Sequence, residues 1–315
     1  MTASDDVVTS EVSALYEEYP YPGHGVISRV VASMLAEPLR RLQARLGRKN
    51  LRLLDAGCGT GEQTIGVARA FPELEVTGVD LNQASLNMAE GFARRDGSRV
   101  RFERRNLMEP IEGLGKFDVI VSVGVLHSLA EPARGFANLR QIAAAQSSFM
   151  GMVYGKYGKW DSIVIRDLLN DLCDGADRRE RLAVLASSRL ARNTGLFHYF
   201  DTLSRRLRFG PSIPLLEGVR RVLAGRSAAY QADTFTHVQE VIYTYQELAG
   251  VLRDAGWHFD GWPKHSGMPD APEQVLRGRG LELARAKPLL EQAAIYERLM
   301  RPMNLFFLAS PLEAP

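Results

Sequence analysis

The chain has 315 residues, of which 45% are hydrophobic and 24% are charged, a balance typical of soluble globular proteins. Its 39 basic and 37 acidic side chains leave a net charge of +2, which argues against a protein that grips nucleic acid or anionic lipid by bulk charge. Apolar runs fall short of the roughly 18 residues of a membrane span. There is no basic-then-apolar signal peptide, and Cys58 and Cys173 cannot build a disulfide scaffold. We therefore expect a soluble, cytoplasmic protein without membrane partners.

Strands and helices alternate through the first half of the chain. The predicted strands are 51–55, 75–80, 100–103, 117–123 and 148–154, and the predicted helices are 62–71, 83–95 and 131–145. The continuous apolar run 117–123 is typical of a strand buried on both faces. This alternation predicts a parallel sheet covered by helices.

The second half interrupts this pattern twice. A capping-box sequence opens a helix at 244–255, and strands are predicted at 257–262 and 303–309, with helical residues at about 272–300. We expect an N-terminal lid and helix over 1–45, and a core formed by 46–154 and 244–315 with a helical insertion at about 262–302. Residues 155–243 are expected to form a helical, substrate-determining insertion.

The first predicted strand ends in a glycine-rich loop, Asp55-Ala-Gly57-Cys-Gly59-Thr-Gly61. Glycines at a strand-to-helix turn let backbone N–H groups approach an anionic ligand. The dinucleotide fingerprint fails, because Glu62 stands where it needs glycine or alanine. Asp80 closes the next strand, where a carboxylate can accept both ribose hydroxyls.

Four segments, LLDAGCGTGEQT, VTGVDLNQASLNMA, RFERRNLMEP and FDVIVSVGVLHSL, resemble in this order and spacing the class I S-adenosylmethionine-dependent methyltransferases. The resemblance covers 51–154 well and 244–262 reasonably. It implies an enzyme with an α/β, Rossmann-like, seven-stranded and mostly parallel sheet. The implied cofactor is S-adenosyl-L-methionine, with S-adenosyl-L-homocysteine as product.

The resemblance also implies roles in cofactor binding. The glycine loop would hold the methionine end, with Asp55 near the amino group, Asp80 on the ribose and Leu81 on the adenine. Asn106 stands where the family usually has an aspartate, but its amide oxygen can still accept the adenine amino group. The implied cofactor-binding residues are Asp55, Gly57, Gly59, Gly61, Asp80, Leu81, Asn106, Leu107 and Val123, of which Val123 would line the path to the acceptor.

His127 is the candidate catalytic residue, because it follows the fourth strand at the edge where such folds bind ligands. With an ordinary pKa near 6.5 it could act as a base. A hydrogen bond to substrate or cofactor, or a structural role, are the alternatives.

The N-terminal segment Tyr16-Glu-Glu-Tyr19-Pro-Tyr21-Pro presents tyrosines from a stiff arm, because proline favours extended backbone. Tyrosine rings stabilise cations, which suits a sulfonium. We expect a lid in which Tyr19 contacts the cofactor, while Tyr16 and Tyr21 contact substrate. The alternative is an arm that only packs its rings onto the domain.

Further substrate contacts are expected from residues next to the long insertion: Tyr154, Tyr157, Asp233, His237 and Tyr243. Asp233 and His237 are four residues apart and would share a helix face as an acid–base pair. A metal is not expected, because a catalytic zinc needs three protein ligands and no third is evident.

The insertion is basic: residues 178–226 hold eleven arginines and three acidic residues. An anionic substrate, or simply a solvated arginine-rich face, would explain this.

The segment Ser122 to His127 lacks the proline pair of nucleic-acid amino-methylating enzymes, and neither cysteine follows a proline, so nucleic acid is a disfavoured partner. The favoured function is O- or N-methylation of a small molecule, with an anionic one among the candidates. The alternatives are an RNA or protein methyltransferase, or a cyclase that releases methylthioadenosine.

Overall fold

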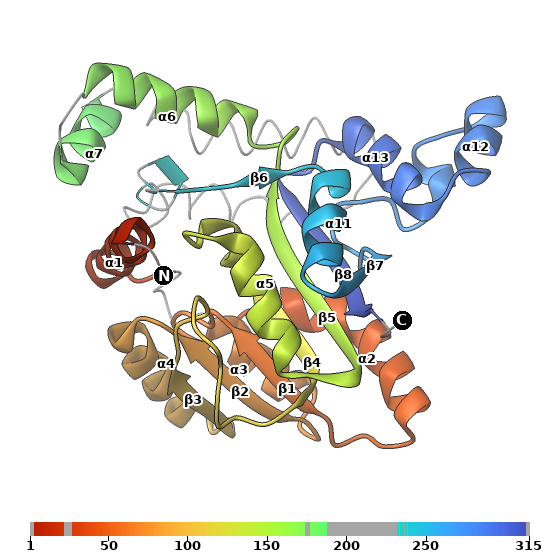
Figure 1. The fold of residues 1–315 in the computed structure, drawn as a ribbon, viewed down its shortest axis with the longest axis horizontal. Coiled ribbons are helices and arrows are strands. Elements are labelled where there is room, and N and C mark those ends of the chain that lie inside the picture. Colours follow the sequence, from red (N-terminus) through yellow and green to blue (C-terminus); the bar gives the residue numbers. More distant parts are fainter. Residues whose placement is uncertain are drawn as a thin grey trace.

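The computed structural model describes residues 3–21, 27–173, 177–187, 232, 234–235, 237 and 239–312. Within these ranges, one eight-stranded sheet runs in the order β3-β2-β1-β4-β5-β8-β7, and the short β6 pairs with the end of β5 (Figure 1). The strands are β1 (Arg52–Ala56), β2 (Glu75–Asp80), β3 (Val100–Arg104), β4 (Phe117–Val123), β5 (Ala143–Gly155), β6 (Ile242–Tyr243), β7 (Trp257–Gly261) and β8 (Asn304–Pro311). Only the pairings of β8, with β5 and β7, are antiparallel, so the predicted mostly parallel α/β fold is confirmed.

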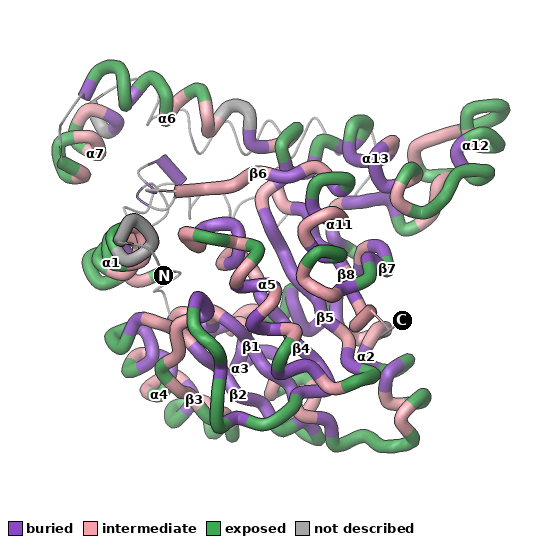
Figure 2. The backbone as a smooth tube through the Cα atoms, in the orientation of Figure 1, coloured by how far each residue is buried: buried purple, intermediate pink, exposed green. Residues whose placement is uncertain are grey.

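Helices cover both faces of the sheet and bury two apolar layers. One layer packs α2 (Val30–Leu46) and α3 (Glu62–Ala70) against the strands, and α4 (Gln83–Asp96) packs beside α3. The other packs α5 (Pro132–Gln141), α11 (Tyr245–Asp254) and α13 (Leu289–Met300). Figure 2 shows these sheet strands as the buried centre. The remaining described elements are α1 (Ala3–Glu18), α6 (Trp160–Leu172), α7 (Arg178–Ser187), α12 (Gly278–Arg285), η1 (Leu126–Ser128) and η2 (Pro272–Gln274).

Two predicted elements were wrong in their bounds. The helix expected over 131–145 ends at Gln141, because Ala143 already pairs with Phe117 and begins β5. Alanines favour a helix locally, but pairing with a buried strand overrides that preference. The helical stretch expected over 272–300 is divided into η2, α12 and α13, with Pro288 as the residue before α13.

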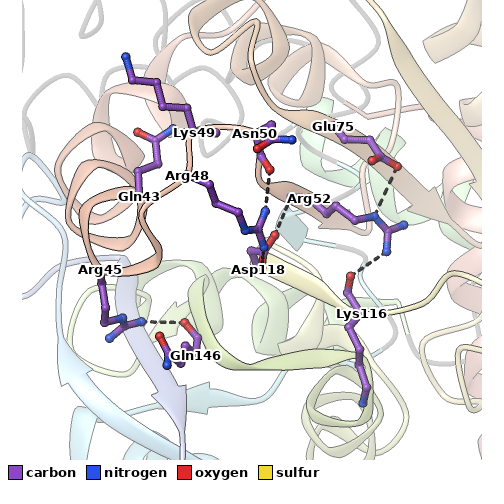
Figure 3. Close-up of polar contacts among 10 residues, drawn as sticks. All are labelled: Gln43, Arg45, Arg48, Lys49, Asn50, Arg52, Glu75, Lys116, Asp118 and Gln146. Atoms are coloured by element: carbon purple, nitrogen blue, oxygen red, sulfur yellow. Dashed lines mark hydrogen bonds and ion pairs between the residues drawn. The ribbon is translucent and has the colours of Figure 1, made fainter.

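Polar contacts close the edge at which the strands begin (Figure 3). Arg48 donates to the buried carboxylate of Asp118 at 2.6 Å, and the backbone N–H of Arg52 donates to the other oxygen at 2.9 Å. The Arg52 guanidinium donates to the carbonyls of Lys116 and Leu114. These groups form hydrogen bonds with one another, so we assign this edge of the sheet a structural role.

The opposite edge, where the parallel strands end, positions the functional groups. Strand order reverses between β1 and β4, and ligands of open α/β sheets bind in the crevice beyond such a point. None of the helices within the described ranges is long and apolar enough to cross a bilayer.

Candidate functional site

The glycine loop after β1 is a close-packed backbone turn. Gly57, Gly59 and Gly61 have φ angles of +83°, +52° and +78°, a region that other residues rarely adopt. A Cβ at Gly57 would lie 2.3 Å from a methyl group of Val125, in the loop after β4. A Cβ at Gly61 would lie 2.8 Å from the Cβ of Ala89. The loop after β1 and the loop after β4 therefore touch at the point where strand order reverses.

Two carboxylates flank this loop. The Asp80 carboxylate accepts N–H bonds from Gly59 at 2.8 Å and from Asn82 at 2.9 Å, which ties the end of β2 to the glycine loop. Asp55 accepts a hydrogen bond from the Thr64 hydroxyl at 2.6 Å. Burial raises the pKa of Asp55 to about 6, opposed by the Thr64 bond and reinforced by the charge of Asp80. Burial likewise raises the pKa of Asp80. A buried and a half-buried carboxylate near each other favour a cationic ligand.

The residues expected beside adenine lie along the ends of β2 and β3. Leu81 is half-buried, and its carbonyl accepts a bond from Arg104 at 3.0 Å. The Asn106 amide oxygen accepts the N–H of Met108 at 3.0 Å, which leaves its second lone pair for a ligand. Leu107 is buried.

β4 leads from Val123, which is half-buried, through Gly124 into η1, which carries His127. His127 is wholly buried, and neither ring nitrogen has a hydrogen-bond partner among the described residues. Its ring packs on Tyr154 of β5 with centroids 4.1 Å apart. Burial, and then the positive charges of Lys159 and His237, lower the pKa of His127 well below 6.5.

A buried ion pair adjoins His127. The Lys159 Nζ lies 3.5 Å from the centroid of the Tyr154 ring and 2.9 Å from Oε1 of Glu240, and Arg166 approaches the same carboxylate at 3.2 Å. The side chains of Lys159 and Glu240 are only 1% and 2% exposed. We call His127, Tyr154, Lys159 and Glu240 the His127 cluster. Sequence reasoning missed Lys159 and Glu240.

The local sequence explains how the loop that carries Lys159 packs against the chain before β8. A Cβ at Gly155 would lie 2.4 Å from the carbonyl oxygen of Pro302, and one at Gly158 would lie 2.3 Å from the backbone N of Met303. Two glycines three residues apart thus let the loop after β5 pass against the start of β8. The spacing of these two glycines was the sequence signal for a closely packed loop at Lys159.

The N-terminal helix α1 touches both sides of the site. The Asn82 amide donates to the carbonyl of Ser13 at 3.3 Å, next to Asp80. At the other side, the Tyr16 hydroxyl lies 3.5 Å from Nε2 of His237. Glu18 pairs with Arg179 of α7 at 3.1 Å. Figure 1 shows α1 beside this edge of the sheet.

The other N-terminal tyrosines follow α1. Tyr19 is half-buried, and Tyr21 is exposed. The Tyr21 carbonyl oxygen would lie 2.9 Å from a Cβ at Gly59, so the backbone of this segment passes over the glycine loop.

The remaining candidates have different surroundings. Tyr157 is exposed. Tyr243 of β6 is buried, which raises the pKa of its hydroxyl to about 12. His237 accepts the N–H of Gln239 at 3.4 Å, whereas Asp233 lies outside the described residues, as does most of the basic segment 178–226. No group of three potential metal ligands occurs among the residues that the structure describes.

Known proteins share this architecture. A family model described as "Methyltransferase domain" matches residues 54–149. The chain is 27% identical over 227 residues to malonyl-[acyl-carrier protein] O-methyltransferase of Geobacter sulfurreducens, covering 69% of this chain and 79% of that protein. It is 29% identical over 276 residues to an uncharacterized protein of Synechococcus sp., covering 82% of this chain and 61% of that protein.

Among solved structures, the fold resembles that of PKMT2 from Rickettsia typhi in complex with AdoHcy. The TM-score is 0.65 at 15% identity, and the match covers 94% of this chain and 56% of that one. The chain thus spans less than two thirds of the PKMT2 chain and of the Synechococcus protein. Residues 54–149, which contain the glycine loop, thus match a methyltransferase domain, and the fold along the chain resembles that of PKMT2.

Proposed function

We propose that the protein transfers a methyl group from S-adenosyl-L-methionine to an oxygen or nitrogen atom of a small-molecule acceptor. The observation that carries this proposal is the contact between the loops after β1 and β4, Gly57 against Val125. Val125 lies two residues before His127, so this contact brings the glycine loop close to His127 and its buried neighbours. The cofactor supplies an electrophilic methyl group, and the chain aligns an acceptor with it and excludes water.

In this proposal the cofactor lies along the ends of β1 to β4. The backbone of the glycine loop would hold its methionine end, where Asp55 would meet the amino group, and Asp80 would accept the ribose hydroxyls with its remaining lone pairs. Leu81, Asn106 and Leu107 would surround the adenine, and Val123 would line the path to the acceptor. The Asp55 and Asp80 carboxylates beside the loop support this placement, because they suit a ligand that carries positive charge.

The acceptor would enter beside the His127 cluster, covered by α1. Tyr16, Tyr21, Tyr154, Tyr157, Asp233, His237 and Tyr243 are the proposed lining residues, and Tyr19 is proposed to face the cofactor. A wholly buried His127 supports a small acceptor, which a closed site can surround. The relative that acts on malonyl-[acyl-carrier protein] at oxygen supports an oxygen acceptor. Action in the cytoplasm stays a prediction.

Calorimetry with S-adenosyl-L-homocysteine tests cofactor binding, and analysis of the nucleoside product tests the reaction. We expect micromolar binding, about 1–100 μM, and S-adenosyl-L-homocysteine as product. Methylthioadenosine would instead favour a cyclase. A steep loss of acceptor binding with added salt would favour an RNA acceptor, because phosphate contacts release counterions.

A further inference from the structure

His127 has no evident reason to be buried. A buried polar group without a hydrogen bond destabilises a protein, and such groups in native structures call for an explanation. Both nitrogens of His127 lack a partner among the described residues, and the ring is held against Tyr154. Since this imidazole stands at the ligand-binding edge of the sheet, a bound ligand explains it better than the fold does.

The surroundings of His127 are unsuited to a base. A histidine base is usually oriented by a carboxylate on its other nitrogen, which stabilises the protonated ring. No such carboxylate bonds to His127 within the described ranges. The charged and titratable groups near it are Lys159, His237, Tyr154 and Glu240, and Glu240 is engaged by Lys159 and Arg166. The ring therefore stays neutral, with one N–H to donate.

A neutral imidazole N–H beside an ammonium group stabilises an oxygen that is already negative. An alcohol or phenol would arrive protonated at neutral pH and would need a base, whereas a carboxylate, with an ordinary pKa near 4, arrives ionised. The second ring nitrogen keeps a lone pair for a water molecule or an acceptor hydroxyl.

We propose that the acceptor is a carboxylate, which binds the N–H of His127 in the field of Lys159 and is converted to a methyl ester. This inference rests on the proposed methyl transfer. A carboxylate oxygen forms the new bond to the methyl carbon as the carbon–sulfur bond breaks and its electron pair stays on sulfur. The negative carboxylate and the positive sulfonium become a neutral ester and a neutral thioether, and no proton moves.

Binding of matched acids and amides tests the proposal without turnover. The protein is loaded with S-adenosyl-L-homocysteine and titrated with benzoate and benzamide, phenylacetate and phenylacetamide, and octanoate and octanamide. We expect at least one acid to bind about tenfold more tightly than its amide. Equal or weaker binding of every acid, or no saturable binding of any acid by about 10 mM, would overturn the carboxylate assignment.

Three variants test whether His127 and the buried ion pair cause the preference for acids over amides. His127→Phe keeps an aromatic ring against Tyr154 but removes the N–H. It should abolish the preference while its melting temperature equals or exceeds that of the wild type, because no protein hydrogen bond is lost. Lys159→Met combined with Glu240→Met removes the buried lysine and the buried glutamate together, while Arg166, which also loses Glu240, is 21% exposed and can be solvated. This double variant should reduce the preference at least about threefold. Lys156→Met is the matched control, since Lys156 lies in the same loop but its side chain is 50% exposed.

The outcomes separate this inference from the proposed function. If the acid preference survives His127→Phe, the assignment to His127 is wrong. If labelled methyl groups transferred to small molecules of a cell extract resist mild alkali, they are not esters; methyl transfer stands and the carboxylate does not. If S-adenosyl-L-homocysteine fails to bind or is not the product, the proposed function itself falls.

Discussion

The two sides of the site differ in both construction and charge. On the proposed cofactor side, Asp55, the glycine loop and Asp80 lie within successive strand-to-helix turns, and Gly59 bonds to Asp80 only 21 positions along the chain. On the proposed acceptor side, Lys159 meets Glu240 across 81 positions, and Tyr16 meets His237 across 221. A short motif can encode the first arrangement, whereas the second exists only after folding.

The two sides also differ in the charges of their side chains. Carboxylates border the proposed cofactor side, where burial raises the pKa of Asp55 and Asp80. On the proposed acceptor side two cations, Lys159 and Arg166, share the one carboxylate of Glu240, and burial and the charge of Lys159 hold the pKa of His127 low. A cationic sulfonium would suit the first region and an anionic acceptor the second, which is the charge pattern that the proposed carboxylate reaction needs.

The largest effect should come from the closest contact between the two loops. Gly57→Ala places a methyl group 2.3 Å from Val125 at a φ of +83°. Left-handed strain and overpacking together should reduce the free energy of unfolding by about 3–4 kcal/mol, measured by chemical denaturation.

Matched variants separate strain from packing at Gly57. Gly97→Ala has a similar φ of +74° but open space, so it should cost only about 1 kcal/mol. Adding Val125→Ala to Gly57→Ala should restore part of the loss. If the two glycine variants are equally destabilised, the loops do not pack as described.

The next largest effect should be a loss of cofactor binding without a loss of stability. Asp80→Ala removes a carboxylate held by two backbone N–H groups and should weaken S-adenosyl-L-homocysteine binding about 100-fold, or about 2.7 kcal/mol, by calorimetry. Glu75→Ala, at the exposed start of the same strand, is the control and should change it less than about twofold. Unchanged binding in Asp80→Ala would contradict the ribose assignment.

The buried carboxylate of Glu297 should affect stability but neither binding step. Glu297 accepts the N–H of Tyr245 at the start of α11, and burial raises its pKa to about 7 from 4.5. A raised acid pKa means that stability is present at low pH and is lost as pH rises from 4.5 through about 7. Glu297→Gln keeps an acceptor oxygen but no charge.

Chemical denaturation at pH 5 and pH 8 checks this sign. Glu297→Gln should be about 2 kcal/mol more stable than the wild type at pH 8 and nearly equal at pH 5. Glu291→Gln, on the same helix but half-exposed, should differ little at either pH. A gain at pH 5 that matches the gain at pH 8 would refute the role of ionisation.

The smallest effect should come from the lid contact. Tyr16→Phe removes a hydroxyl 3.5 Å from His237, at the long end of hydrogen bonding. We expect a loss of less than about 1 kcal/mol, or less than about fivefold in the affinity for S-adenosyl-L-homocysteine. Tenfold weaker binding would instead mean that α1 controls the cofactor side directly.

The cofactor side could be predicted because its spacing is local. A strand, a positive-φ turn and a helix need glycines at fixed offsets, and the next strand must end in register beside them. The predicted strands therefore lay close to the observed ones. The alanine-rich start of β5 could not be predicted, because its pairing with Phe117 outweighs a helical preference.

The sequence by itself determined the fold class and the strand-to-helix glycine loop, because these depend on periodicity and short-range spacing. Only the tertiary structure decided which polar groups are buried together beyond the sheet. Lys156 and Lys159 are alike in the sequence, each after a glycine, yet one is half-exposed and the other is buried on Tyr154 and paired with Glu240. Burial is a property of the whole packing, and it gives an ordinary lysine and an ordinary histidine the surroundings on which the proposed site rests.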